Sequence, residues 1–192
     1  MKTGLTERTI KNLQLNAGVL LKSYTKGGEI AESNIIGATR GGGTFSAVPT
    51  VHQVSVDGAP VYVKGLERVD EWVVTLAVSS FLEFTPDSLS SALAVAVKKE
   101  TVSDGTKLTC SRTVAAGDYQ DIYWVGDTSD GKNIVIHLKN CLNLTGLVIT
   151  QNDKGEGTYP VTYTAHYDAP TTAQADFETA PFDIIFEDTA GV

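Results

Sequence analysis

Apolar and polar positions alternate with a period of two along three segments of the chain. In segment 71–79 the apolar face consists of Trp72, Val74, Leu76 and Val78. In segment 133–139 it consists of Ile134, Ile136 and Leu138. In segment 159–167 it consists of Tyr159, Val161, Tyr163, Ala165 and Tyr167. Such alternation is typical of β-strands that bury one face and leave the other in water.

Shorter strands are expected at residues 19–24, 51–57, 121–125, 142–150 and 182–186. Turn signals such as Asp57-Gly58, Asp104-Gly105 and Asp130-Gly131 separate the strands. Segment 169–181 is polar and poor in large apolar residues, so we expect a connector to the final strand there.

Segment 86–99 has helical rather than strand spacing. Thr85 is suited to the N-cap, and Pro86 to the first helical position. Lys98 and Lys99 indicate the C-terminal end, where the helix dipole favours cations. We therefore predict a single mainly β domain over residues 1–192. Its fold is expected to be an antiparallel β-sandwich or partial barrel with one flanking α-helix.

The charge of the chain limits its partners. The net charge is −8, whereas a tight nucleic-acid binder normally has a basic face. Residues 1–28 carry five basic side chains and one acidic, and residues 151–192 carry eight acidic and one basic. Opposite charges at the two ends suit head-to-tail contact between copies, although two solvated ends would look the same. No apolar run has the length of a membrane span, so we expect no membrane partner.

Three consecutive glycines, Gly41 to Gly43, mark segment 38–50. A phosphate-binding loop would need a lysine at fixed spacing and a helix after it, but a strand-like segment follows. We therefore expect a mobile loop at about 38–50 that becomes ordered against another copy of the chain. The residues expected in this inter-subunit contact are Arg40, Gly41, Gly42, Gly43 and Phe45.

The sequence contains no local signature of catalysis. His52, His137 and His166 lie in different expected strands without metal-ligand spacing. No Gly-x-Ser-x-Gly motif is present, and neither Cys110 nor Cys141 has a recognisable catalytic context. We expect no enzymatic activity, no catalytic residue, no metal and no cofactor.

Segment 35–94 contains a series of short motifs. Ile36-Gly37-Ala38-Thr39 comes first, followed by Gly42-Gly43, Phe45 and Pro49, and then by the Val56-Asp57-Gly58 turn. Val63-Lys64-Gly65 and the Phe81–Thr85 segment before the helix complete the series. With these motifs the segment resembles the major tail tube proteins of tailed bacteriophages, especially those with long non-contractile tails. Segment 146–168 resembles the closing hairpin of that family, and segment 16–24 resembles its first strand.

The resemblance extends from about residue 13 to residue 186, and the order of the motifs carries it rather than any one of them. Residues 99–131 are less similar to the family, so we expect a phage-specific insert there. In the family, subunits form hexameric rings that stack into a tube, and DNA passes through the tube into the host. The expected partners are other copies and other tail proteins such as the tape measure and the terminator. The expected location is the virion tail, assembled in the cytoplasm of the bacterial host.

The resemblance also implies that one sheet lines a DNA channel, where a surface without Lys or Arg would let DNA slide. The polar faces of segments 71–79 and 159–167 fit this role. The lumen-facing candidates are Glu71, Thr75, Ser79, Thr162, Thr164 and His166.

Three alternatives stay open at this point. The chain could form the inner tube of a contractile tail or of a phage-tail-like bacteriocin. It could also be a stand-alone β-sandwich binding module, for which Tyr119, Tyr123 and Trp124 are the candidate aromatic residues. A hydrolase would need convergent polar groups, which the sequence does not indicate.

Overall fold

The computed structural model describes residues 3–14, 16–168 and 179–190, and it is mainly β, with 45% strand and 11% helix. All strand pairs are antiparallel among these residues, as predicted. The strands are β1 (Val19–Leu21), β2 (Gly43–Gln53), β3 (Glu67–Phe81), β4 (Val97–Val102), β5 (Gly105–Cys110), β6 (Gln120–Asp127), β7 (Lys132–Asn143), β8 (Tyr159–Thr164) and β9 (Phe182–Ala190). The helices are α1 (Glu7–Lys11) and α2 (Pro86–Leu93), with 3-10 turns at Glu32–Asn34 and Ala116–Asp118.

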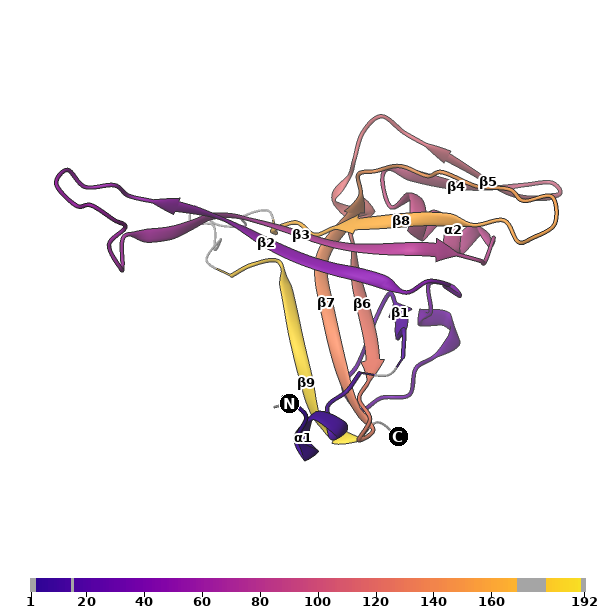
Figure 1. The fold of residues 1–192 in the computed structure, drawn as a ribbon. Helices are drawn as coiled ribbons and strands as arrows, with labels where there is room; N and C mark the ends of the chain where they lie inside the picture. The colour runs from indigo at the N-terminus through magenta and orange to yellow at the C-terminus, as the bar shows by residue number, and fades with distance from the viewer. Residues whose placement is uncertain (1–2, 15, 169–178, 191–192) are drawn as a thin grey trace.

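Seven strands form one bent sheet in the order β1-β6-β7-β8-β3-β2, with β9 paired to the free side of β7. Strands β2, β3 and β8 run across the top of Figure 1, and β6, β7 and β9 descend beneath them. Strand β7 belongs to both groups, because its early part pairs with β6 and β9 while Leu142 and Asn143 pair with β8. The two groups pack against each other in a sandwich-like arrangement with the main core between them.

The predicted alternation accounts for the buried side of β3 and β8. Val74, Leu76 and Val78 are buried on β3, and Tyr159, Val161 and Tyr163 are buried on β8. The rings of Phe81 and Tyr159 are stacked with centroids 5.3 Å apart. Burial of such side chains contributes roughly 1.5–3 kcal/mol each to folding.

The prediction for segment 133–139 was incomplete, because β7 is covered on both faces. Leu138 is buried in the main core, as expected. Val135 is also fully buried, but on the opposite face, where it packs with Leu21 and Val125 in a second small core. The N-terminal segment that contains β1 packs on this second face. The alternation within β7 alone cannot predict a contact with a segment so distant in the sequence.

Helix α2 begins as predicted but ends six residues early. Thr85 forms a capping box with Ser88, and Pro86 opens the helix. The helix ends where Ala94 adopts a left-handed backbone with φ of 38°. Lys98 and Lys99 lie instead in β4, whose pairing with β5 outweighs the helical spacing. Lys99 reaches back to the first turn of α2, where its Nζ lies 2.6 Å from Oδ1 of Asp87.

Other boundaries also differ from the predictions. The expected loop 38–50 is a strand from Gly43 onward, because every residue from 43 to 53 pairs with β3. The expected strand 142–150 ends at Asn143, and the strand 51–57 ends at Gln53 as part of β2. Helix α1 was not anticipated. Region 99–131 contains most of the β4–β5 hairpin and also β6, which belongs to the main sheet. Residues 169–178 of the expected connector lie outside the described residues.

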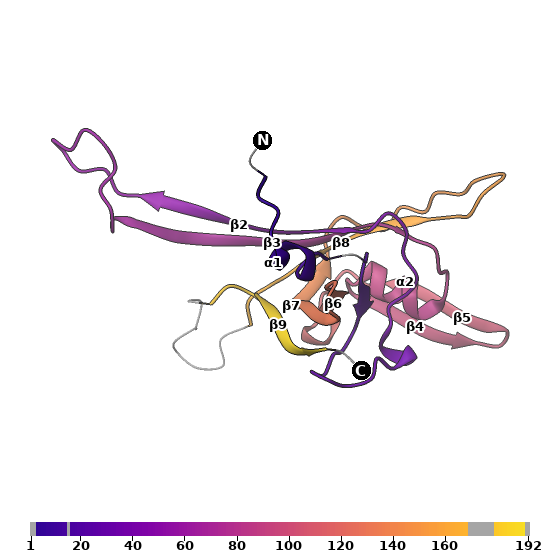
Figure 2. The ribbon, with the colours of Figure 1, turned by 60° about the horizontal axis from the view of Figure 1, so that its bottom comes forward.

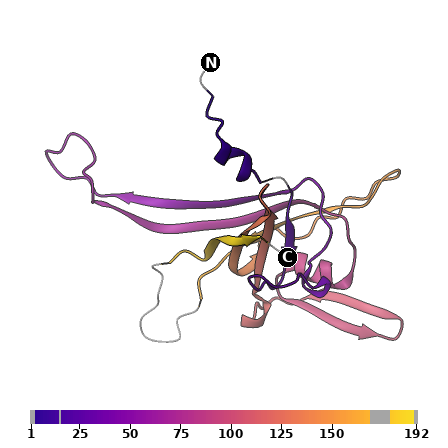
Figure 3. The same ribbon diagram turned by 90° about the horizontal axis from the view of Figure 1, so that it is seen from below.

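Strands β2 and β3 continue well beyond the rest of the molecule as a two-stranded ribbon. We call the part from Val48 to Val73, including the turn region 54–66 at its far end, the arm. Figures 1, 2 and 3 show the arm projecting from the body in every view. No other described strand pairs with it, because the β8 pairing of β3 begins at Thr75.

The role of Asn143 in holding α2 on the sheet can be tested by substitution. Its side-chain amide donates to the carbonyls of Ala92, at 2.6 Å, and Gly146, at 2.9 Å, and its Oδ1 accepts from Thr145. Because Asn143 is fully buried, Asn143→Ala leaves these groups without partners. We expect the free energy of unfolding, measured by urea denaturation, to fall by about 2–3 kcal/mol.

The matched control is Asn152→Ala. Its amide also donates to a backbone carbonyl, that of Glu156 at 3.0 Å, but in an exposed turn where water can replace it. We expect a change within about 0.5 kcal/mol for the control. Equal losses in the two variants would contradict the role assigned to Asn143.

Candidate assembly surfaces

The arm exposes an unusual amount of apolar surface. Nine of its large apolar side chains are between 44% and 75% exposed. They are Val48, Val51, Val54, Val56, Val61, Tyr62, Val63, Val69 and Val73. Large exposed apolar surfaces are uncommon on soluble monomers, so the arm is a candidate interaction surface.

The register of the ladder places exposed valines on both faces of the arm. Val48 pairs with Val73 on the face opposite the core. A bulge between Thr50 and Val51 then shifts the register, so that Val51 pairs with Val69 on the other face. Cross-strand pairs of β-branched residues stabilise the ribbon locally, but they remain open to solvent in a single chain.

The predicted lumen-facing residues of β3 and β8 share one face of the sheet. Thr75 lies directly opposite Thr164, and Ala77 lies opposite Thr162. Glu71 continues this face toward the arm, opposite Thr50. Among the paired positions from 44 to 50 and from 71 to 77, and at Thr162 and Thr164, Glu71 is the single charge on this face. Their position toward a channel stays a prediction.

Ser79 and His166, the other two candidates, are occupied by local contacts. The hydroxyl of Ser79 donates to the carbonyl of Gly41 at 3.3 Å. Nδ1 of His166 lies 3.0 Å from the carbonyl oxygen of Asn140, and its ring packs edge-on against Tyr119. The Ser79 contact joins β3 to the turn before β2, and the contact between His166 and Asn140 holds the end of β8 against β7.

The glycine run lies close to β3 of its own chain. The amide of Arg40 donates to Ser80 at 2.8 Å, and the amide of Ser79 donates to Gly42 at 3.2 Å. Gly41 and Gly42 have φ of 85° and 69°, which side chains disfavour. A Cβ at Gly41 would also come within 3.3 Å of the Cβ of Ser79. The glycines thus allow a tight turn into β2.

Arg40 and Phe45, the other residues expected in an inter-subunit contact, also have partners in their own chain. Nη1 of Arg40 lies 3.1 Å from Oε2 of Glu156, in a solvent-exposed pair of the kind that adds little stability. The ring of Phe45 packs on Phe182 with centroids 5.4 Å apart. Their role between subunits stays a prediction.

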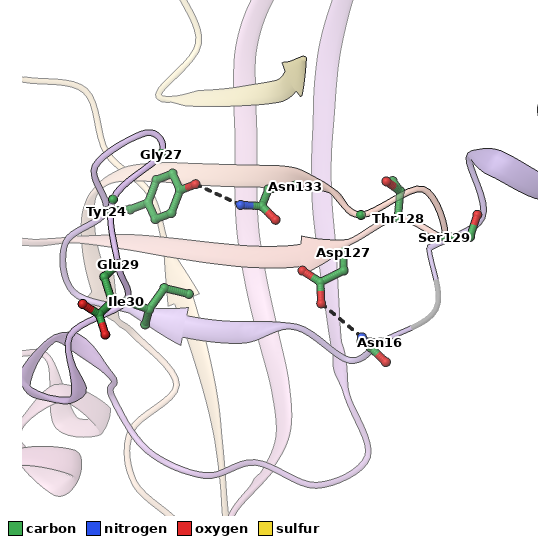
Figure 4. Close-up of a pocket in the computed structure, with 11 residues that line it drawn as sticks. Asn16, Tyr24, Gly27, Glu29, Ile30, Asp127, Thr128, Ser129 and Asn133 are labelled. Carbon is green, nitrogen blue, oxygen red and sulfur yellow. Dashed lines mark hydrogen bonds between the residues drawn. The ribbon is translucent and has the colours of Figure 1, made fainter. Parts of the chain in front are cut away.

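A polar cavity of about 700 Å³ lies beside the second core (Figure 4). The hydroxyl of Tyr24 donates to Oε1 of Glu187 at 2.9 Å, and the amide of Asn133 donates to Oε2 at 3.1 Å. Burial raises the pKa of the Tyr24 hydroxyl. Across the cavity, the amide of Asn16 donates to Asp127 at 3.2 Å. Glu187 is buried, so these bonds hold β9 to β7 and to the N-terminal segment.

A second polar cluster joins β6, β7 and β9. Nε2 of His137 lies 3.0 Å from Oδ2 of Asp121, and its Nδ1 lies 3.4 Å from Oδ2 of Asp183. The imidazole is stacked on Tyr123 at 4.1 Å, and Nζ of Lys139 lies 2.9 Å from Asp183. Burial alone would raise the pKa of Asp183, but Lys139 and His137 outweigh it and lower that pKa.

The three candidate aromatic residues of a binding module do not form one exposed platform. Tyr123 and Trp124 are consecutive in β6 and therefore point to opposite faces. Tyr123 stacks on His137, whereas Nε1 of Trp124 donates to the carbonyl of Ala17 at 2.7 Å. Tyr119 packs against His166.

Within the described parts of the chain, no group of three or more His, Cys, Asp or Glu side chains is placed to hold a metal ion. In the same residues, no helix has the length and apolar character of a membrane span. A comparison with known proteins gave no matching family model and no similar curated sequence.

The turn into β2 can be tested by substitution. Gly41→Ala and Gly42→Ala each force a side chain into the left-handed region. We expect each to lower the free energy of unfolding by about 1–2 kcal/mol in urea denaturation. The control is Gly105→Ala, where φ is not left-handed and an added Cβ meets no atom within 4 Å. A loss as large in the control would show that the turn geometry is not the cause.

The Asp183 cluster predicts a dependence of stability on pH. Because folding lowers the pKa of Asp183, its carboxylate stabilises the protein above about pH 4, the ordinary value of an aspartate. This contribution is lost as the pH falls through the lower, folded-state pKa. Asp183→Asn should therefore lower the melting temperature at pH 7, and the difference from the wild type should shrink toward pH 3.

The comparison is made by thermal unfolding from pH 7 to pH 3, with Asp153→Asn in an exposed turn as the control. The control should follow the wild type throughout. A difference for Asp183→Asn that stays constant with pH would contradict the assignment.

Proposed function

We propose that the chain is a structural virion protein, the major tail tube protein of a bacteriophage with a long non-contractile tail. Copies form hexameric rings, the rings stack into a tube, and DNA passes through the tube during ejection. Other tail proteins, such as the tape measure and the terminator, meet the same tube in the virion. The order of the motifs from Ile36 to Thr85 supports this proposal.

The arm is the single observation that carries the proposal. It projects from the body and bears nine large, exposed apolar side chains. A two-stranded ribbon has little stability in water by itself, so a partner that covers the arm stabilises both. If the arm lies on a different surface of the next copy, the contact is head-to-tail, and contacts of this kind generate rings and filaments.

The open face of β2, β3 and β8 supports the role of a DNA conduit. Between residues 44–50 and 71–77, and at Thr162 and Thr164, its positions carry threonine, serine, alanine and valine, with Glu71 as the one charge, whereas Arg68 lies farther out along the arm, opposite His52. Nucleic-acid affinity comes largely from Lys and Arg on phosphates, so this face would bind DNA weakly. The inner tube of a contractile tail or of a phage-tail-like bacteriocin would use the same geometry. A stand-alone binding module has less support, because its candidate aromatic residues are not gathered on one surface.

The proposal is tested by assembly and by a shortened arm. Purified protein at high concentration with a crowding polymer should form hollow tubes in negative-stain electron microscopy. In the variant, residues 52–68 are removed and Val51 is joined to its cross-strand partner Val69 by an Asn-Gly turn. This variant should keep the circular dichroism spectrum of the wild type and remain monomeric, because it lacks the outer part of the arm and five of the nine exposed apolar side chains.

The matched control shortens the β4–β5 hairpin, which also projects from the body. Residues 100–107 are removed, and Lys99 is joined to its partner Leu108 by the same turn. The control should still form tubes. A wild type that stays monomeric under all these conditions would contradict the proposal, and so would tubes formed equally well without the arm.

A further inference from the structure

A small uncharged cleft lies where the arm joins the body. It has a volume of about 180 Å³ and is lined by Gln14, Gly43, Phe45, Leu76, Trp124 and Ile136. Gly43 and Phe45 belong to β2 and Leu76 to β3, so the strands that form the arm also form one wall. Trp124 and Ile136, which pair across β6 and β7, form the other wall.

The size and lining of this cleft suit one aromatic side chain. Sites for drug-sized molecules usually have about 300–1,000 Å³, whereas an apolar cavity of about 150 Å³ accepts a benzene ring. None of the lining residues is charged, so a ring can enter without desolvating an ion. Nε2 of Gln14 donates to the carbonyl of Asn16 at 3.1 Å, so its Oε1 is the atom that can accept a hydrogen bond from a tyrosine hydroxyl.

The far end of the arm carries a matching side chain. Tyr62 is 68% exposed and stands between Val61 and Val63, which are also exposed. The tip lies at the opposite end of the arm from the cleft, and Figures 2 and 3 show the arm extending away from the body. Tyr62 therefore does not fill the cleft of its own chain.

The apolar area of the arm favours a second copy as the partner. If about half of each side chain is exposed, the nine residues present on the order of 400–500 Å² of apolar surface. A standard interface takes about 800 Å² from each partner, so the two faces of the arm together supply about half of one. The turn region 54–66 and the cleft are different surfaces of the same chain, so a turn seated in the cleft of the next copy is a head-to-tail contact that can repeat from copy to copy.

We infer that Tyr62 of one copy inserts into the cleft between Phe45 and Trp124 of the next copy. This contact is heterologous, and it anchors the arm along the neighbouring subunit. The inference rests on the proposed function, because it names the surface that receives the arm during assembly. It makes Tyr62 the central aromatic anchor of the interface, a position in which truncation commonly costs the most affinity.

Disulfide trapping tests the contact directly. Both proteins carry Cys110→Ala, which removes the exposed cysteine, while the buried Cys141 is kept. One protein has Tyr62→Cys and the other has Gln14→Cys, so a bond between them can form only between two copies. Under mild oxidation in mixed tubes, we expect a covalent dimer on a non-reducing gel. The control replaces Tyr62→Cys by Ser103→Cys, in the turn of the β4–β5 hairpin, and should give no dimer.

Substitution at Tyr62 gives a second readout. Tyr62→Ala should raise the protein concentration needed for tube formation at least tenfold, whereas Tyr62→Phe keeps the ring and should stay close to the wild type. Tubes that form normally with Tyr62→Ala and give no disulfide between positions 62 and 14 would overturn this inference and leave the proposed function standing. A wild type that forms no tubes would overturn both.

Discussion

The change of direction within β7 is the constraint on which the rest of the fold depends. At Asn140 the backbone takes a left-handed conformation, with φ of 51°, which asparagine tolerates better than most residues. The amide of Asn140 donates to Asp121 at 3.0 Å, and its carbonyl oxygen lies 3.0 Å from Nδ1 of His166. The bend is therefore held from β6 on one side and from the end of β8 on the other.

This bend allows one strand to serve two groups of strands. Up to Leu138, β7 pairs with β6 and β9, and after the bend Cys141 still pairs with β6 while Leu142 and Asn143 pair with β8. The bend also brings Asn143 beneath α2, where its amide binds the carbonyl of Ala92 at the end of the helix. The core then closes around β3 and β8, which leaves the outer parts of β2 and β3 beyond the body as the arm.

Charges that suggested contact between copies are partly satisfied within one chain. Glu187, from the acidic C-terminal region, accepts a hydrogen bond from Tyr24 in the N-terminal region. Asp183 contacts Lys139, and Glu156 contacts Arg40. Apolar surface on the arm is therefore a stronger basis for assembly than the opposite charge of the two ends. Apolar contact is also less sensitive to salt than attraction between exposed charges.

The alternation of side chains determined the mainly β class and the buried faces of β3 and β8, because the period of two is a local property of a strand. Thr85 and Pro86 likewise determined where α2 begins, since capping needs only neighbouring residues. Tertiary structure decided the rest. Pairing of β4 with β5 placed Lys98 in a strand, so that α2 ends before it. Hydrogen bonds with β3 hold the glycine run in a turn beside Ser79. Packing of Leu21 and Val125 buries Val135 on the second face of β7. The tertiary structure also left the valines of the arm exposed. Burial depends on segments that are distant in the sequence, and a local pattern of apolar residues does not show which segment packs on them.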